Sequence, residues 1–335
     1  AETEEERRTF ELRSKARPQV GNTDDNGDVF SDSSEMVGGL ADCAELADCD
    51  LMSVIAGGIQ EIPFEHRVPH VVDAVRQLWA QRLAEKESLD EELAALLEDG
   101  FPELEEWTTP PIAQRMLRAN DGDESAAVDI LARAVEYRVR DRKLFKSKHC
   151  EVTCDMRVIG RDLEARPCVY VCTRSQESPF GSLNNQIILA IEAACDLTHA
   201  AGQIVILVDF HGFSPSLNTD FGAIKEVANR LSTVYADRLH LVLLVDFSRI
   251  ASGLWWFVTP MMKEKTRKKI RFVGKSQARD IIGKMFDKEI HERISRSFDV
   301  NRDPHCTLQA RKLHAQRTSI CNTPLGRMRV PDEAG

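Results

Sequence analysis

Two almost uninterrupted apolar runs constrain the fold of this chain more than any other feature. Residues 203–210 and 239–247 are rich in Val, Ile and Leu and lack the alternation of a strand with one polar face. Such runs are typical of strands buried on both faces of a parallel sheet. Between them, apolar residues recur at helical spacing at Phe221, Ile224, Ala228, Leu231 and Tyr235. The sequence therefore predicts a strand, a crossover helix and a second parallel strand.

The same alternation extends to both sides of this unit. Residues 166–173 and 270–273 are further strand-like runs, and residues 184–200 have apolar positions at helical spacing. Residues 71–97 and 112–142 also have helical periodicity. We expect an α/β fold with a largely parallel sheet, preceded by an α-helical N-terminal lobe.

Acidic residues are concentrated at the N-terminal end. The net charge is −10, and residues 1–60 hold 14 acids and 5 bases, which leaves about −1 for the rest. We expect residues 1–62 to form an acidic, disordered arm. Residues 63–145 would form the helical lobe, residues 146–300 the sheet domain, and residues 301–335 a C-terminal tail.

Cellular location is predicted from what the sequence lacks. No apolar run reaches the roughly 18 residues needed to cross a bilayer, and no basic, apolar leader is visible. Nine cysteines without a regular framework favour reduced thiols and an intracellular protein. Because the chain starts at Ala1, an organellar location after removal of a leader stays open.

Two C-x₃-C pairs raise the question of a metal site. They are Cys150 with Cys154, and Cys168 with Cys172. Structural zinc sites more often have two intervening residues, and residues i and i+4 of a strand share one face. We expect buried structural thiols and no metal.

The phosphate-binding and nucleophile motifs of common α/β enzymes are missing. We find no G-x-G-x-x-G after the first strand, no G-x-x-x-x-G-K-[ST] and no G-x-S-x-G. Asp209, His211 and Asp246 follow buried strands, where ligands of open α/β sheets bind. Because no nucleophile or metal set accompanies them, we expect turn-forming roles, no catalysis and no cofactor.

The segment between the last two strands is apolar on all faces. Residues 252–263 include Leu254, Trp255, Trp256, Phe257, Val258, Met261 and Met262. Such a helix is covered either by protein on every side or by a hydrophobic ligand on one side. Directly after it, residues 263–275 carry seven cations and one acid. This run predicts an anion site or a membrane-facing patch, with a solvated basic surface as the simpler alternative.

Taken in order, several segments resemble the CRAL-TRIO, or Sec14-like, lipid-binding family. Residues 204–214 resemble its strand ending in Asp-x-x-Gly, and residues 231–239 resemble its helix end Tyr-Pro-Glu-Arg-Leu. Residues 260–270 resemble its Pro-x₅-Thr-x₂-Lys-Ile segment. Residues 115–119 and 137–138 resemble its Arg-x-Leu-Arg-Ala and Trp-Arg motifs. The match covers roughly 165 residues.

The resemblance implies a concave sheet floor with helices on one side and a hydrophobic pocket closed by a mobile gate helix at residues 252–263. The pocket and gate residues would be Leu254, Trp255, Phe257, Val258, Met261, Met262, Ile206 and Val208. Burial of an acyl chain, at about 0.8 kcal/mol per CH₂, would supply affinity without any reaction. The bound lipid would be the ligand.

The resemblance also implies a headgroup site. In members that bind phosphatidylinositol, the Thr and Lys of Thr-x-x-Lys, the acid after Tyr-Pro and an N-terminal Arg bind the headgroup. Thr266 and Lys269 match, Asp237 replaces Glu, and Arg118 or Arg115 would supply the guanidinium. The membrane-facing cations would be Lys263, Lys265, Arg267 and Lys268.

Several positions depart from the family pattern. Ile204 and Ile206 occupy positions that carry hydroxyls in phosphatidylcholine-binding members, which argues against choline recognition. Ala236 replaces the usual Pro, and Ser248-Arg249 replaces an Asn-x-Pro-like turn.

We therefore expect a cytoplasmic, peripherally membrane-associated protein that binds a phosphoinositide, transfers or presents it at membranes, and has no nucleic-acid partner. The alternative is a scaffold or complex subunit whose degenerate pocket is filled by side chains and whose residues 1–62 bind a protein partner. An enzyme, with Asp209 or His211 in the reaction, is the third interpretation.

Overall fold

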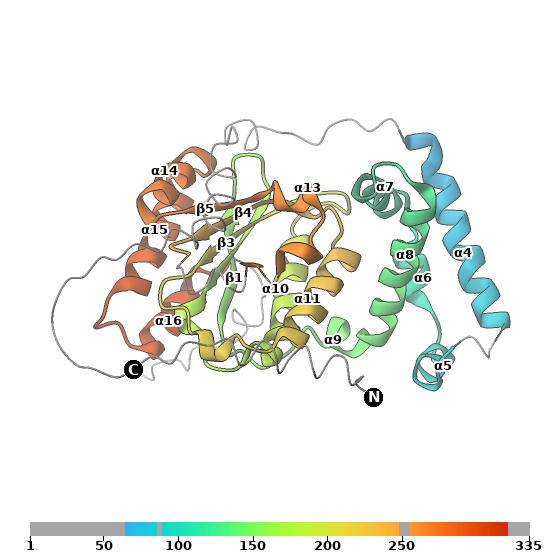
Figure 1. The fold of residues 1–335 in the computed structure, drawn as a ribbon, viewed down its shortest axis with the longest axis horizontal. Coiled ribbons are helices and arrows are strands. Elements are labelled where there is room, and N and C mark those ends of the chain that lie inside the picture. The colour runs from blue at the N-terminus through green and yellow to red at the C-terminus, as the bar shows by residue number, and fades with distance from the viewer. Residues whose placement is uncertain (1–63, 86–88, 248–254, 257, 321–335) are drawn as a thin grey trace, which may run out of the picture. The chain divides into compact units, whose positions relative to one another are not determined.

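The computed structural model describes residues 64–85, 89–247, 255–256 and 258–320 (Figure 1). All of them belong to one compact unit, residues 39–335. Within these described ranges, no helix combines the length and the apolar character required to cross a bilayer.

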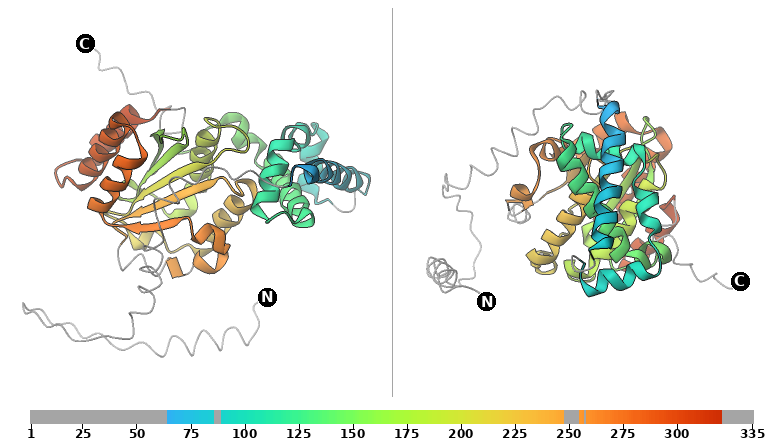
Figure 2. Two further views of the ribbon diagram at one scale, coloured as in Figure 1. Left: turned by 90° about the horizontal axis from the view of Figure 1, so that it is seen from above. Right: turned by 90° about the vertical axis from the view of Figure 1, so that its right-hand side faces the viewer.

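Residues 65–147 form a bundle of helices. After a short 3-10 turn, η1 (Glu65–Arg67), the helices are α4 (Val68–Ala84), α5 (Glu91–Glu98), α6 (Pro102–Trp107), α7 (Pro110–Ala119), α8 (Glu124–Arg140) and α9 (Arg142–Ser147). α4, α7 and α8 pack on one another (Figure 2) around the fully buried Trp79. Asp90 and Asp123 cap α5 and α8 by accepting bonds from backbone N–H groups three residues on. The predicted helical lobe is thus present.

A five-stranded sheet follows. Its strands are β1 (Asp155–Arg161), β2 (Pro167–Cys172), β3 (Ile204–Asp209), β4 (Leu239–Val245) and β5 (Ile270–Val273), and they lie in this order across the sheet. β2 to β5 are parallel, and β1 pairs antiparallel with β2. The crossover connections from β2 to β3 and from β3 to β4 contain α10 (Asn184–Cys195) and α11 (Phe221–Val234), respectively. The predicted fold class is confirmed, whereas β1 is an addition.

Helices cover both faces of the sheet, which corrects the expectation of helices on one side. α14 (Lys275–Met285) and α15 (Lys288–Arg302) bury one face, where Ile282 and Phe298 pack on Leu207 and Leu243. α10 and α11 lie on the other face, as Figure 1 shows. The physical reason is that a parallel sheet apolar on both faces needs two covering layers.

The chain continues as a helix within residues 301–335, which were expected to form a tail. α16 (Leu308–Thr318) packs on β1, and the Ile320 N–H donates a 2.9 Å bond to the carbonyl of Val158. This contact protects part of the edge strand.

Candidate functional site

An apolar surface covers the β3–β5 half of the sheet on the face opposite α14 and α15. Its members, called here the apolar-face cluster, are Ile206, Val208, Val242, Leu244, Ile270, Phe272, Trp255 and Met262. Val242, Leu244 and Ile270 are buried. The side chains of Ile206 and Val208 in the middle strand are only half-buried. The structure thus brings together Ile206, Val208, Trp255 and Met262, four of the predicted pocket residues.

A row of aromatic rings extends from the carboxyl end of this face. Successive ring centroids lie 5.4, 4.8, 4.9 and 4.8 Å apart along Phe213, Phe210, Phe247, Phe272 and Trp255. The last three contacts are edge-to-face, an arrangement that the ring quadrupole favours. The rings therefore occupy part of the space above the carboxyl ends of the strands.

The two neighbouring tryptophans have opposite environments. Trp255 packs edge-to-face on Phe272, whereas the side chain of Trp256 is 78% exposed. The remaining predicted gate residues are described in part: Val258 is half-buried, whereas Leu254, Phe257 and the side chain of Met261 lie outside the described residues. The segment continues through η6 (Thr259–Met261) into α13 (Glu264–Arg267).

Three of the predicted headgroup residues form one ion-paired group, called here the Asp237 cluster: Arg118, Asp237 and Lys269. Arg118 Nε lies 2.6 Å from Asp237 Oδ2, and Lys269 Nζ lies 3.4 Å from Asp237 Oδ1. Lys269 Nζ also donates a 2.6 Å bond to the carbonyl of Leu239. Lys269 directly precedes Ile270, so the cluster adjoins the amino-terminal end of the apolar-face cluster.

The charge balance of the Asp237 cluster suits an anionic ligand. Its side chains carry two cations and one carboxylate, and the Asp237 side chain is 7% exposed. Burial lowers the pKa of Lys269, and the carboxylate of Asp237 opposes that shift. The group therefore holds one positive charge in excess, at a place where water is largely excluded.

Arg115 has a different role from Arg118 in this structure. Its side chain is 1% exposed, and Nη1 donates to the carbonyls of Val234 and Ala236 at 3.1 and 2.7 Å. Val234 is the last residue of α11 and Ala236 follows it by two residues, and a cation at a helix end satisfies otherwise unpaired acceptors. Arg115 thus supports the turn that presents Asp237, while Thr266 is half-buried in α13 and accepts the backbone bond of Lys269.

The carboxyl ends of β3 and β4 meet in a second ionic network. Asp209 is fully buried and accepts bonds from Tyr170, Asn301 and both terminal nitrogens of Arg302. Arg302 also contacts Asp246. Burial lowers the pKa of His211, whose backbone N–H donates to Asp209. Arg302 was not identified from the sequence as part of this network, because its partner Asp209 lies 93 residues away along the chain.

The predicted basic patch is partly engaged by the helical lobe. Lys263 Nζ donates to the carbonyl of Ala119 at 3.0 Å, and Lys265 Nζ donates to that of Arg118 at 2.9 Å. Lys268, directly after α13, pairs with Glu264 at 2.7 Å. Arg267 is half-buried. Two of the four expected membrane-facing cations therefore make contacts with α7.

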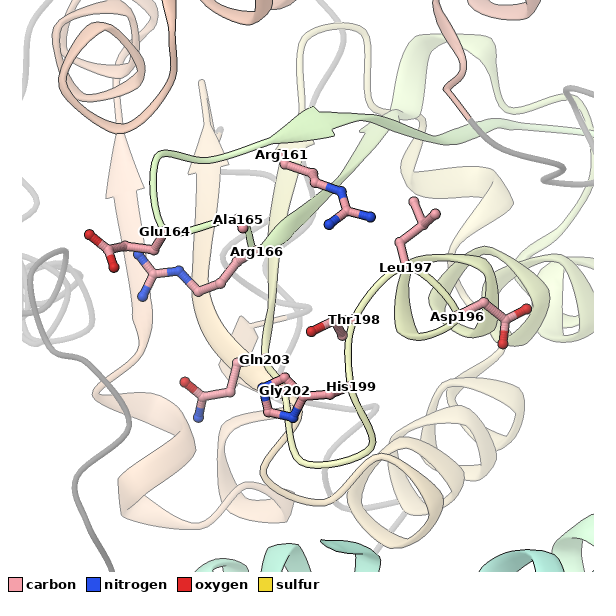
Figure 3. A pocket seen from close by; sticks show the side chains of 10 residues that line it. All are labelled: Arg161, Glu164, Ala165, Arg166, Asp196, Leu197, Thr198, His199, Gly202 and Gln203. Carbon is pink, nitrogen blue, oxygen red and sulfur yellow. The ribbon is translucent and has the colours of Figure 1, made fainter.

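A cavity of about 550 Å³ opens at the amino-terminal edge of the sheet (Figure 3). The β1–β2 turn and the α10–β3 loop line it, and Arg161 and Thr198 point toward it. A second cavity, of about 500 Å³, lies on the helical lobe between Val68 and Pro111. Neither cavity is lined by the apolar-face cluster, so a lipid-sized chamber over that cluster remains a prediction.

Comparison with known proteins identifies the domain that contains the sheet. The CRAL/TRIO domain model matches residues 156–294. The chain is 28% identical over 172 residues to the CRAL-TRIO domain-containing protein C23B6.04c of Schizosaccharomyces pombe, which covers 50% of this chain and 17% of that relative. The crystal structure of Sfh5 aligns with 13% identity and a TM-score of 0.44, covering 65% of this chain and 82% of the other. Residues 156–294, which contain nearly all of the sheet, therefore form a CRAL/TRIO domain.

Proposed function

We propose that this chain binds a phosphoinositide between the apolar-face cluster and the segment that carries Trp255 and Met262. It transfers or presents this lipid at anionic membranes from the cytoplasm, as a binding protein and not as an enzyme. The acyl chains lie on the sheet, and the headgroup phosphate is bound by the Asp237 cluster.

The observation that carries the proposal is the unequal covering of the two sheet faces. On the face under α14 and α15, Leu207 and Leu243 are each 1% exposed. On the other face, Ile206 and Val208 of the same central strand are only half-buried. Each buried CH₂ of an acyl chain would contribute about 0.8 kcal/mol, so completing this burial is a sufficient source of affinity.

The polar end of the lipid would meet the Asp237 cluster. Lys269 supplies a point charge, Arg118 supplies a planar guanidinium, and a phosphate accepts bonds from both types of group. Asp237 pairs with both cations and so holds them close to each other. Because Lys269 and Ile270 are neighbours in the sequence, the contacts to the headgroup and those to the acyl chains would lie side by side.

Organic extraction of the full chain purified from cells tests the proposal directly. We expect phosphatidylinositol in the extract, identified by mass spectrometry, and a matching mass increase of the native protein. Val208→Trp would fill the space over β3 and abolish co-purification, whereas Leu163→Trp, at a 66% exposed position, would not. Wild-type protein whose native mass equals that of the bare chain contradicts lipid binding.

The row of aromatic rings favours a second candidate function. Phe210, Phe247 and Phe272 pack on one another over the same face, which is what a pocket filled by side chains requires. In that case the domain is a scaffold, and the acidic residues 1–62 bind a protein partner. Two results together would support the scaffold. The purified protein would contain no lipid, and a protein partner would be lost on deletion of residues 1–62 but retained in Val208→Trp.

A further inference from the structure

The C-terminal end of α7 is completed by two lysines from a distant part of the chain. Lys263 Nζ contacts the carbonyl of Ala119 and also Asn120 Oδ1, at 3.0 and 2.7 Å. Lys265 Nζ contacts the carbonyl of Arg118 and also Asp121 Oδ1, at 2.9 and 3.1 Å. Lys263 and Lys265 thus make four contacts with the four successive residues 118–121.

These contacts suit the chemistry of a helix end. The last carbonyls of a helix lack partners within the helix and carry partial negative charge. The side-chain amide of Asn120 donates to the carbonyl of Met116, and the Gly122 N–H donates to the carbonyl of Leu117. Lys263 then supplies a donor to the carbonyl of Ala119, and Lys265 supplies a second donor to that of Arg118, which also accepts the Asp121 N–H at 3.4 Å.

The two lysines lie between the two parts of the proposed lipid site. Met262, directly before Lys263, belongs to the apolar-face cluster, and Lys269, four residues after Lys265, belongs to the Asp237 cluster. Attachment of this stretch to α7 therefore fixes the described chain from Met262 to Lys269 between the sheet and the helical lobe.

We propose that Lys263 and Lys265 form a latch that an anionic lipid surface opens, because lipid phosphates and carboxylates compete with the end of α7 for the same two ammonium groups. This inference rests on the proposed function, in that release of the latch is what admits and discharges lipid. In water the lysines hold the stretch against α7, and at an anionic bilayer they exchange those acceptors for lipid.

The balance of the competing interactions makes such an exchange feasible. Both lysines are exposed, and the Lys265–Asp121 pair has side chains that are 49% and 84% exposed. Exposed pairs and helix-end contacts are weak and are screened by salt. The attraction of a lysine to an anionic bilayer is of the same order, so several anionic lipids suffice to shift the equilibrium.

Asp121→Asn tests the latch without removing a lysine. It deletes the charge that holds Lys265, and Asn tolerates the positive φ of 52° at this position. The matched control is Glu264→Gln, which removes an exposed acid that pairs with Lys268, the residue directly after α13. Both variants change net charge equally and leave all basic residues in place.

The first measurement is amide hydrogen exchange at residues 117–123 of the full chain. We expect faster exchange with vesicles of phosphatidylcholine and phosphatidylserine, and no change with phosphatidylcholine alone. In Lys263→Ala/Lys265→Ala, exchange should already be fast without vesicles and show no further rise. Unchanged exchange on the anionic vesicles, or in the double variant, overturns the latch.

The second measurement is transfer of fluorescent phosphatidylinositol to phosphatidylcholine vesicles. Asp121→Asn should raise the rate about two- to fivefold, the range expected for loss of one exposed ion pair, and Glu264→Gln should not. Transfer that is equal in both variants overturns the latch and leaves lipid binding intact. Protein that contains no lipid contradicts the proposed function, while the exchange measurement still decides the latch.

Discussion

Arg302 donates two hydrogen bonds to Asp209, at 2.7 and 2.9 Å, and so ties the last turn of α15 to the carboxyl end of β3. The Asp209 side chain is fully buried, and that of Arg302 is 14% exposed. The same guanidinium contacts Asp246, which follows β4. One side chain therefore joins α15 to two neighbouring strands, and this geometry explains Asp209 as a structural residue.

Arg302→Ala should destabilise the fold strongly. Removing one partner of a buried pair leaves an uncompensated charge, which typically costs about 3–5 kcal/mol. Urea unfolding should show this loss in the free energy of unfolding. Asp209→Asn/Arg302→Ala should recover part of it, and Lys288→Ala, at an 89% exposed side chain, should change it little. An Arg302→Ala protein as stable as the wild type contradicts a structural role for the pair.

Lys269→Ala should weaken phosphatidylinositol binding without unfolding the domain. Loss of a charge-assisted hydrogen bond costs about 1.5–3 kcal/mol, which corresponds to an affinity roughly 10- to 100-fold lower. Titration with phosphatidylinositol vesicles measures the effect, and circular dichroism checks the fold. Lys288→Ala is the charge-matched control. Equal affinity of the two variants removes Lys269 from the headgroup site.

His314 should make stability depend on pH. Burial, followed by the nearby charges of Arg157 and Arg296, lowers its pKa from 6.5 to about 4, and its Nε2 lies 3.0 Å from Ser297 Oγ. The unfolded chain binds this proton first as pH falls. The free energy of unfolding should therefore decline between pH 6.5 and 4, by about 1–2 kcal/mol for a half-buried ring.

Urea unfolding at several pH values measures this effect by comparison with His314→Gln. The variant lacks the titrating ring, so the difference in stability between the two proteins should shrink or change sign as pH falls below 6.5. Parallel pH profiles would show that His314 does not titrate differently on folding.

The neighbouring tryptophans should differ in energy and in access to water. Trp255→Ala removes an edge-to-face partner of Phe272 and should cost about 1–3 kcal/mol. Trp256→Ala, at a 78% exposed position, should change stability by less than about 0.5 kcal/mol. Acrylamide quenching should also lose its most accessible component in Trp256→Ala and keep it in Trp255→Ala. The reverse pattern would mean that the Trp255 ring does not pack on the sheet in solution.

Local patterns in the sequence predict the parallel part of the sheet well. The run predicted at residues 270–273 is the strand observed, and the runs at 203–210 and 239–247 contain β3 and β4. β1 is missed because Asp155 and Arg157 interrupt its apolar pattern. The structure explains this interruption, since the two side chains form a buried ion pair with each other. The spacing of apolar residues does not reveal that two charged side chains two positions apart neutralise each other in the folded protein.

Only those residues of the candidate site that belong to recognisable sequence motifs are predictable from the sequence. The order of motifs brings Arg118, Asp237 and Lys269 into one hypothesis, and the structure shows that Arg118 and Lys269 both pair with Asp237. The contacts of Lys263 with α7 and of Arg302 with Asp209 span 144 and 93 residues. No local periodicity encodes such pairings, because they depend on how finished elements pack.

If one face of the sheet binds lipid as proposed, the two faces separate folding from recognition, and this has an evolutionary consequence. Substitutions under α14 and α15 disturb a sealed interior and are removed by selection for stability. Substitutions at Ile206 or Val208 meet a half-open surface and are tolerated more often. Under the proposed function, a lineage built on this chain could thus change its ligand by small steps along one face while the other face stays the same.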